Sequence, residues 1–170
     1  MGIEVTNPYR TPSRLQHVPL LAEIRPESLL AEGVRGLILD LDNTLLGFGA
    51  SAPSPENQAW VAAARGAGLE IVLLSNNFGP RVSEIAAGLG LHGIPNALKP
   101  LPLGFLRAKR ALGMRAREVV VIGDQLFTDV LGATLCGMRA ILVEPIEDRD
   151  FPLTRIFRRL ERLVLPERRA

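Results

Sequence analysis

Short apolar runs alternate along the chain with longer segments in which apolar residues recur at helical spacing. The apolar runs have the length of strands, and they occupy residues 36–41, 70–74, 94–98, 119–122 and 140–143. The segments at helical spacing lie between them, at residues 55–66, 80–89, 102–112 and 128–136. Strands covered on both faces are apolar at nearly every position, and strands that alternate with helices form parallel sheets. The pattern therefore predicts an α/β fold with a mostly parallel sheet.

The two ends of the chain depart from this alternation. Prolines interrupt the apolar residues of 1–33, which predicts an irregular lead-in with one short helix after Pro26. Residues 34–145 contain all the predicted strands and form the predicted core. In residues 153–165 an apolar stripe has arginines on its other faces, which predicts a basic amphipathic helix. With 170 residues, the chain is expected to be a single domain.

Positive charge is concentrated at the C-terminal end of the chain. The formal net charge is +2, but residues 155–170 contain six arginines and two glutamates, so the rest of the chain is slightly acidic. A slightly acidic protein surface does not favour binding to polyanions in general. We therefore expect no nucleic-acid partner. The basic helix has two interpretations: it packs on the sheet with its arginines in water, or it lies on an anionic phospholipid surface.

The single cysteine, Cys136, excludes an intramolecular disulfide framework and a cysteine-rich zinc site. So little cysteine is typical of a reducing compartment. The sequence shows neither a secretory leader nor an apolar run of about 20 residues that could cross a bilayer. We therefore expect a cytoplasmic protein, and the basic helix leaves open a peripheral position at the inner face of the membrane.

Two carboxylates stand at the end of the first predicted strand. Asp40 and Asp42 belong to an Asp-Leu-Asp-Asn-Thr sequence, and side chains two residues apart on a strand point the same way. Such carboxylates repel each other and lose hydration unless a cation or a catalytic task holds them. A capping and turn cluster would explain Asp42, Asn43 and Thr44 but not Asp40. We therefore predict that this strand end carries chemistry.

Polar residues also follow the next three predicted strands. Ser75 and Asn76 offer hydroxyl, amide and backbone N–H groups to a phosphate, although they also suit an ordinary turn. Lys99 stands in a loop, where a lone lysine is usually solvated. Asp124 follows its strand directly, and Asp129 comes five residues later, where it also suits a helix N-cap. Because the carboxyl ends of parallel strands share one edge, the four groups predict a single site.

These segments resemble the four motifs of the haloacid dehalogenase superfamily of phosphotransferases. The pentapeptide from Asp40 to Thr44 matches the first motif, Ser75 the second, Lys99 the third, and Asp124 with Asp129 the fourth. The resemblance covers about residues 34–143. More narrowly, GVRGLILDLDNTL, SNN, NALKPLP and GDQLFTDVLGA are similar to the YqeG-type subfamily, which resembles the mitochondrial and plastid phosphatidylglycerophosphate phosphatases. The resemblance implies a three-layer, Rossmann-like fold of the capless subclass IIIA.

The resemblance also implies a role for each residue. Asp40 would attack phosphorus and form an aspartyl-phosphate, while Asp42 would serve as general acid and then general base. Lys99 would stabilise the charge of the transferring phosphoryl group, and Thr44 would also orient the loop around Asp42. The substrate contacts would come from Thr44, Ser75, Asn76 and Lys99. The ligands of a Mg²⁺ ion would be Asp40, Asp42 through its backbone carbonyl, Asp124, and Asp129 directly or through water.

The spacing of the motifs limits the kind of substrate. About 30 residues separate Thr44 from Ser75 and about 24 separate Ser75 from Lys99, and the predicted helices use most of them, so no cap domain fits. A site without a cap is open unless a neighbouring subunit covers it, which leaves a homo-oligomer open as well. An open site favours a phosphate on a large or surface-held substrate.

Phosphatidylglycerophosphate is therefore the favoured phosphorylated substrate, by the subfamily resemblance and by the basic helix. A phosphatase for a soluble sugar or nucleotide phosphate is the first alternative. A receiver-like signalling module would share the acidic pocket, hydroxyl and lysine, but its phosphorylated aspartate would stand at the end of a middle strand, where this chain has Ser75 or Lys99. An inactive scaffold is disfavoured because every expected catalytic residue is present.

Overall fold

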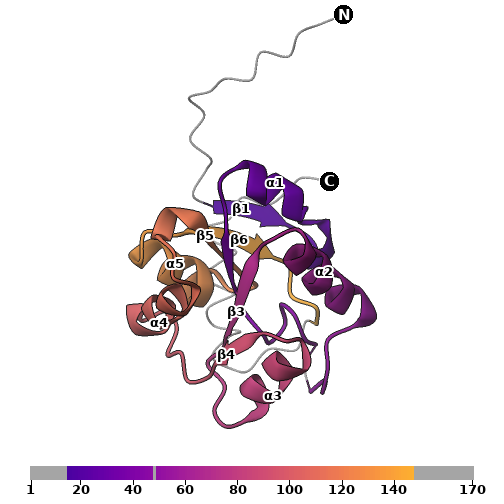
Figure 1. Ribbon diagram of the computed structural model, residues 1–170. Coiled ribbons are helices and arrows are strands. Elements are labelled where there is room, and N and C mark those ends of the chain that lie inside the picture. Colours follow the sequence, from indigo (N-terminus) through magenta and orange to yellow (C-terminus); the bar gives the residue numbers. More distant parts are fainter. Residues whose placement is uncertain (1–14, 48, 148–170) are drawn as a thin grey trace, which may run out of the picture.

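Six parallel strands form one sheet in the order β1-β6-β5-β2-β3-β4, and Figure 1 shows helices packed around this sheet. The computed structural model describes residues 15–47 and 49–147. The strands are β1 (Leu15–Val18), β2 (Gly36–Leu39), β3 (Glu70–Leu74), β4 (His92–Ile94), β5 (Val119–Gly123) and β6 (Arg139–Val143). Strand β2 lies between β3 and β5, so the chain passes from one side of β2 to the other between β4 and β5. Ligands of open parallel sheets bind at such a switch point, outside the carboxyl ends of the strands.

Helices cover both faces of the sheet. They are α1 (Pro26–Ala31), α2 (Pro55–Gly66), α3 (Arg81–Gly88), α4 (Pro102–Leu112) and α5 (Leu131–Leu135), with short turns η1 (Leu21–Glu23), η2 (Ala116–Glu118) and η3 (Leu126–Val130), the last of which is a π-helix. Alternate residues of β2, β3, β5 and β6 enter two separate cores: in β2, Leu37 and Leu39 pack with α1, α2 and α3, whereas Ile38 packs with α4 and α5. This arrangement confirms the predicted three-layer α/β fold.

Local sequence explains where α2 and α4 begin and end. A proline opens each of them, at the position where a missing N–H does no harm. The Ser54 hydroxyl caps α2 by accepting a hydrogen bond from the Asn57 N–H at 3.2 Å. Helix α4 ends at Leu112 and is followed by Gly113, whose φ of 66° is the left-handed conformation that glycine adopts without strain. Both helices therefore occupy the predicted residues.

Three regions differ from the predictions. The lead-in was expected to be irregular apart from its helix, but Leu15–Val18 pairs with β6 as the edge strand β1, and Trp60 of α2 donates a hydrogen bond to Ile24 O at 2.7 Å. The strand expected over 94–98 ends at Ile94, because Asn96 and Leu98 have positive φ and the chain turns back to bond Ser75 and Asn77. The helix expected from residue 128 begins two residues earlier, as η3.

The basic helix expected over 153–165 lies outside the described residues, so its contact with the sheet or with a lipid surface stays a prediction. Within residues 15–47 and 49–147, none of the helices has the length and apolar character needed to span a bilayer. Between β2 and β3 the described chain contains one helix, α2, and between β3 and β4 one helix, α3. No further domain lies between these described elements.

Candidate active site

A pocket of about 420 Å³ lies at the carboxyl edge of the sheet. It is formed where β2, β3 and β5 end and where the chain loops out after β4. Its lining consists of Asp40, Asp42, Gly49, Ser75, Asn76, Asn77, Arg81, Lys99, Gln125 and Thr128. Most of the side chains predicted from the four strand ends thus meet at one place. The remaining three, Thr44, Asp124 and Asp129, are buried next to it.

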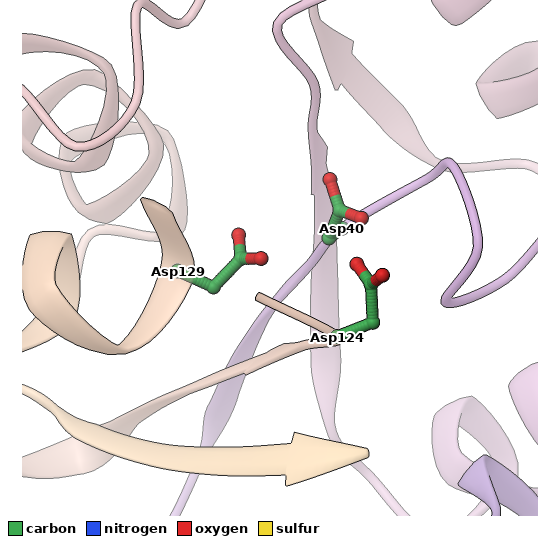
Figure 2. A group of neighbouring side chains, drawn as sticks. All are labelled: Asp40, Asp124 and Asp129. Atoms are coloured by element: carbon green, nitrogen blue, oxygen red, sulfur yellow. The ribbon is translucent and has the colours of Figure 1, made fainter. Parts of the chain in front are cut away.

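Three carboxylates from separate elements converge at this edge of the sheet (Figure 2). Asp40 follows β2, Asp124 follows β5, and Asp129 lies in η3; each is buried, and one oxygen of each lies within 4.8 Å of the others. Gly123 makes this approach possible, since a Cβ atom there would lie 2.3 Å from the Asp129 Cγ. Buried carboxylates this close together are the oxygen donors that hard divalent cations prefer.

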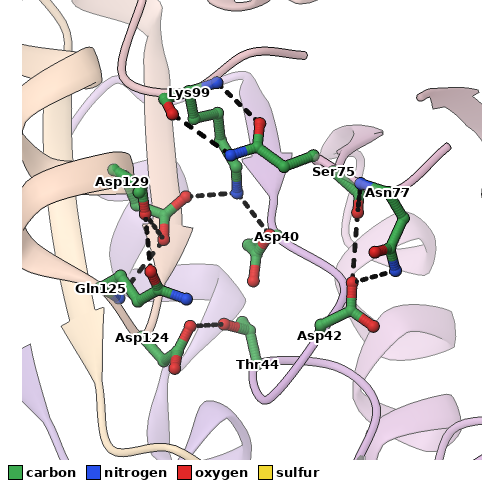
Figure 3. Close-up of polar contacts among 11 residues, drawn as sticks. Asp40, Asp42, Thr44, Ser75, Asn77, Lys99, Asp124, Gln125 and Asp129 are labelled. Atoms are coloured by element: carbon green, nitrogen blue, oxygen red, sulfur yellow. Dashed lines mark hydrogen bonds and ion pairs between the residues drawn. The ribbon is translucent and has the colours of Figure 1, made fainter. Parts of the chain in front are cut away.

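Lys99 joins two of these carboxylates (Figure 3). Its Nζ forms an ion pair with Asp40 Oδ1 and another, 2.6 Å long, with Asp129 Oδ1. One ammonium group therefore stands among three buried carboxylates, which leaves an excess of negative charge when all three are ionised. Uncompensated buried charge is costly, so the donor set fits a divalent cation that would complete the neutralisation.

The pKa values reflect this crowding. Burial raises the pKa of Asp40 to about 7; Lys99 opposes the shift, and Asp129 adds to it. Burial alone would lower the pKa of Lys99, but the carboxylates of Asp129 and Asp40 outweigh burial and raise it. Lys99 is therefore cationic at neutral pH. A cation bound beside Asp40 would favour its ionised form, because an opposite charge at short range lowers a carboxyl pKa.

Asp42 is held on a different side of the pocket from the three buried carboxylates. Its Oδ2 accepts hydrogen bonds from Asn77 Nδ2 at 2.7 Å and from Ser75 Oγ at 3.2 Å, and its Oδ1 pairs with Arg81 Nη1 at 3.0 Å. The Asp42 side chain is 42% exposed, against 7% for Asp40. A buried carboxylate and an accessible one, two residues apart, therefore have different surroundings, which can give two carboxyl groups different chemical behaviour.

Thr44 and Asn76, which were expected to touch substrate, contact protein groups here. The Thr44 hydroxyl donates to Asp124 Oδ1 at 3.4 Å and is itself buried. The Asn76 side chain accepts from Lys99 N at 2.7 Å and donates to Lys99 O at 3.2 Å. These contacts position Asp124 and Lys99. A direct contact of Thr44 or Asn76 with substrate stays a prediction, as does the metal contact of the Asp42 carbonyl.

The paired hydrogen bonds of Asn76 lead to a prediction for Asn76→Ala. Without them the Lys99 loop keeps only its backbone bonds to Ser75 and Asn77, and we expect activity to fall about 10-fold as Lys99 becomes less precisely placed. The unfolding free energy should fall by only about 1 kcal/mol, because a hydrogen bond contributes about 0.5–1.5 kcal/mol net and Asn76 is exposed, so water can replace part of what the two bonds contribute. Phosphatase assays and urea denaturation measure both quantities. Ser83→Ala, at an exposed position of α3, is the control; equal activity in the two variants would contradict a positioning role.

Two residues of the site were missed in the sequence. In the sequence, Asn77 reads as part of an ordinary Ser-Asn-Asn turn, and Arg81 is one of many arginines. Arg81 is the first residue of α3, and it reaches Asp42 Oδ1 and Ala50 O, the latter at 2.9 Å from Nη2. The signal available was an arginine soon after a strand-end turn, which is weak evidence in an arginine-rich chain.

Comparisons with known proteins agree with this geometry. Residues 97–145, which include Lys99, Asp124 and Asp129, match the HAD-hydrolase-like family model. The chain is 37% identical over 150 residues to the probable phosphatase YqeG of Bacillus subtilis, covering 88% of this chain and 87% of that protein. It is 27% identical over 164 residues to phosphatidylglycerophosphate phosphatase 1 (chloroplastic/mitochondrial) of Arabidopsis thaliana, covering 89% of this chain and 47% of that protein.

A solved structure gives the same family. The HAD phosphatase from Thermococcus onnurineus superposes with a TM-score of 0.50 and 26% identity, over 59% of this chain and 50% of that one. The relative from Bacillus subtilis is matched over nearly its whole length, whereas the chain spans about half of the plant relative. The chain therefore belongs to the haloacid dehalogenase superfamily of phosphatases, among its YqeG-type members.

Proposed function

We propose that this phosphatase hydrolyses phosphatidylglycerophosphate with the help of Mg²⁺, through an aspartyl-phosphate on Asp40. The observation that carries the proposal is the division of carboxylates within one pocket. Asp40 is buried and paired with Lys99, while Asp42 is accessible and hydrogen-bonded to Ser75, Asn77 and Arg81. This division suits a reaction in which one carboxylate attacks phosphorus and the other transfers protons.

The reaction would proceed in two steps. In the first, a carboxylate oxygen of Asp40 attacks phosphorus, the ester P–O bond breaks, and the leaving oxygen takes a proton from Asp42. In the second, Asp42 removes a proton from water as that water attacks phosphorus, and the bond between phosphorus and Asp40 breaks. Inorganic phosphate is released, and both carboxyl groups return to their starting states.

The residues that would hold Mg²⁺ are Asp40, Asp124 and Asp129, on the evidence of their convergence and burial. Bound there, the ion would supply positive charge to the transferring phosphoryl group. Lys99 adds a second positive charge from the same side, fixed by its two ion pairs. The Thr44 hydroxyl would keep Asp124 in a fixed orientation, as partners of metal ligands commonly do.

Three features support a lipid as the substrate. The plant relative is named as a phosphatidylglycerophosphate phosphatase. Exposed apolar side chains flank residues that line the pocket: Phe78, 76% exposed, follows Asn77, and Leu98, 53% exposed, precedes Lys99. The basic segment 153–165, outside the described residues, would add attraction to an anionic surface. An uncapped pocket with an apolar rim suits a phosphate held at a membrane surface.

A substrate screen tests this proposal. Phosphatidylglycerophosphate in mixed micelles is compared with a soluble sugar phosphate and a nucleoside monophosphate, with Mg²⁺ and with chelator. We expect Mg²⁺-dependent phosphate release and a kcat/KM at least about 10-fold higher for the lipid, since contacts outside the phosphate contribute to transition-state binding. A higher kcat/KM for a soluble ester would contradict the lipid assignment and would favour a phosphatase for a soluble sugar or nucleotide phosphate. Activity that is equal with chelator would contradict the metal assignment.

A further inference from the structure

A second cavity adjoins the catalytic pocket. It has a volume of about 380 Å³ and is lined by residues of α2, of α3 and of the segment that leads into α2. Arg81 lines both this cavity and the catalytic pocket. A substrate that occupies the catalytic pocket could therefore extend past Arg81 into the second cavity.

Arg81 is held at the boundary between the two cavities. Its guanidinium pairs with Asp42 Oδ1 through Nη1 and donates to Ala50 O through Nη2. Glu84 lies one turn further along α3 and lines the second cavity, yet among the described residues Arg81 forms its ion pair with Asp42. An arginine has five N–H donors, and two of those of Arg81 have acceptors in the described part of the chain. The side chain is 36% exposed, so its other donors are available to a ligand.

The position of Arg81 indicates which part of a substrate it would meet. Asp42 is the residue assigned to protonate the leaving oxygen, and Arg81 is bonded to Asp42. The ammonium group of Lys99 already forms ion pairs with Asp40 and Asp129, on the side of the site where the phosphoryl group would bind. Among the described residues that line the pocket, Arg81 is thus the exposed cation nearest the leaving group. It would not be needed for the scissile phosphate itself.

We propose that the second cavity binds the leaving alcohol and that Arg81 binds a second acidic group on that alcohol, a phosphodiester. Arginine suits this task because its planar guanidinium can donate two parallel hydrogen bonds to a phosphate. The Ser51 hydroxyl and the Gln58 carboxamide line the same cavity and suit the hydroxyl of a polyol. Glu84 would repel an anion bound close to it in the second cavity, so the phosphodiester would lie at the end of that cavity formed by Arg81. The inference rests on the proposed phosphatase function and names the substrate feature that the enzyme selects.

Two soluble esters test the inference. Glycerophosphoglycerol phosphate, the deacylated headgroup, carries a phosphodiester on its leaving alcohol, and glycerol 3-phosphate does not. For the full-length enzyme with Mg²⁺ we expect kcat/KM to be about 30-fold higher for the first, mainly through KM, as a charge-assisted contact would give. In Arg81→Gln the ratio of the two kcat/KM values should fall close to one. Arg107→Gln, which removes an exposed arginine of α4, should keep the ratio of the unchanged enzyme.

The ratio separates binding of the second anion from positioning of Asp42. If Arg81 serves only to hold Asp42, the variant loses activity on both esters and keeps their ratio, and the inference is overturned. The same conclusion follows if the unchanged enzyme does not discriminate between them. If neither ester is hydrolysed, the proposed function fails, and calorimetric binding with Mg²⁺ decides the inference. Tighter binding of the phosphodiester compound that Arg81→Gln removes would support it, whereas equal binding would overturn it.

Discussion

Asp40→Asn should abolish Mg²⁺-dependent phosphate release, lowering kcat by at least about 10³-fold, while the protein stays folded. An amide of the same size cannot form the acyl-phosphate, and loss of an enzymatic nucleophile costs several orders of magnitude in rate. Phosphate release under single-turnover conditions measures the effect directly. Unchanged activity in this variant would remove Asp40 from the role of nucleophile and with it the proposed mechanism.

The stability of Asp40→Asn should change by only about 1 kcal/mol in the presence of chelator. The pKa of Asp40 is raised from 3.8 to about 7, so its ionised form is less favourable in the folded protein than in the unfolded chain. Ionisation of the buried Asp40 therefore lowers the unfolding free energy progressively as the pH rises from 3.8 to about 7. An amide avoids that loss, but it also gives up the ion pair with Lys99. The rise in Tm that Mg²⁺ causes should shrink in the variant. Glu56→Gln, an exposed carboxylate-to-amide change on α2, should leave that rise unchanged.

The sheet and most of the site could be predicted because their signals are local in sequence. Strands β2 and β5, and β3 after its exposed first residue Glu70, are buried on both faces and read as unbroken apolar runs. A charged residue directly after such a run, as at Asp40 or Asp124, has no ordinary structural reason to be there. The topology of parallel strands then places these residues at one edge. Neither step requires knowledge of tertiary contacts.

The remaining features depend on contacts between distant parts of the chain. Strand β1 is an edge strand with Gln16 and His17 exposed, and it becomes a strand by pairing with β6, more than 100 residues later. Leu98 has a φ of 54°, which leucine rarely adopts, and the loop is held by bonds to the turn after β3. Arg81 belongs to the site because it reaches Asp42, 39 residues earlier. The pattern of apolar and polar residues along the chain does not indicate which distant segments contact each other.

Lys99→Met is expected to give the largest loss of stability among the site variants. The substitution keeps a long unbranched side chain in a position that is 4% exposed but removes the charge that Asp40 and Asp129 share. Removing one partner of a buried ion pair typically costs about 3–5 kcal/mol, because the other charge stays buried and unpaired. We expect the unfolding free energy in chelator to fall by about 3 kcal/mol or more, and kcat to fall at least about 100-fold. Urea denaturation and phosphatase assays measure the two effects.

The response to Mg²⁺ distinguishes this electrostatic explanation from simple loss of packing. With Lys99 gone, the three carboxylates carry a larger excess of negative charge, so added Mg²⁺ should raise the Tm of Lys99→Met by more than that of the unchanged protein. Adding Asp129→Asn removes one of the repelling charges, so the double variant should be more stable in chelator than the two single effects added together. A smaller Mg²⁺ response together with strictly additive effects would show that Lys99 acts by packing. A larger response with coupling would show that Lys99 and the cation compensate the same buried charge.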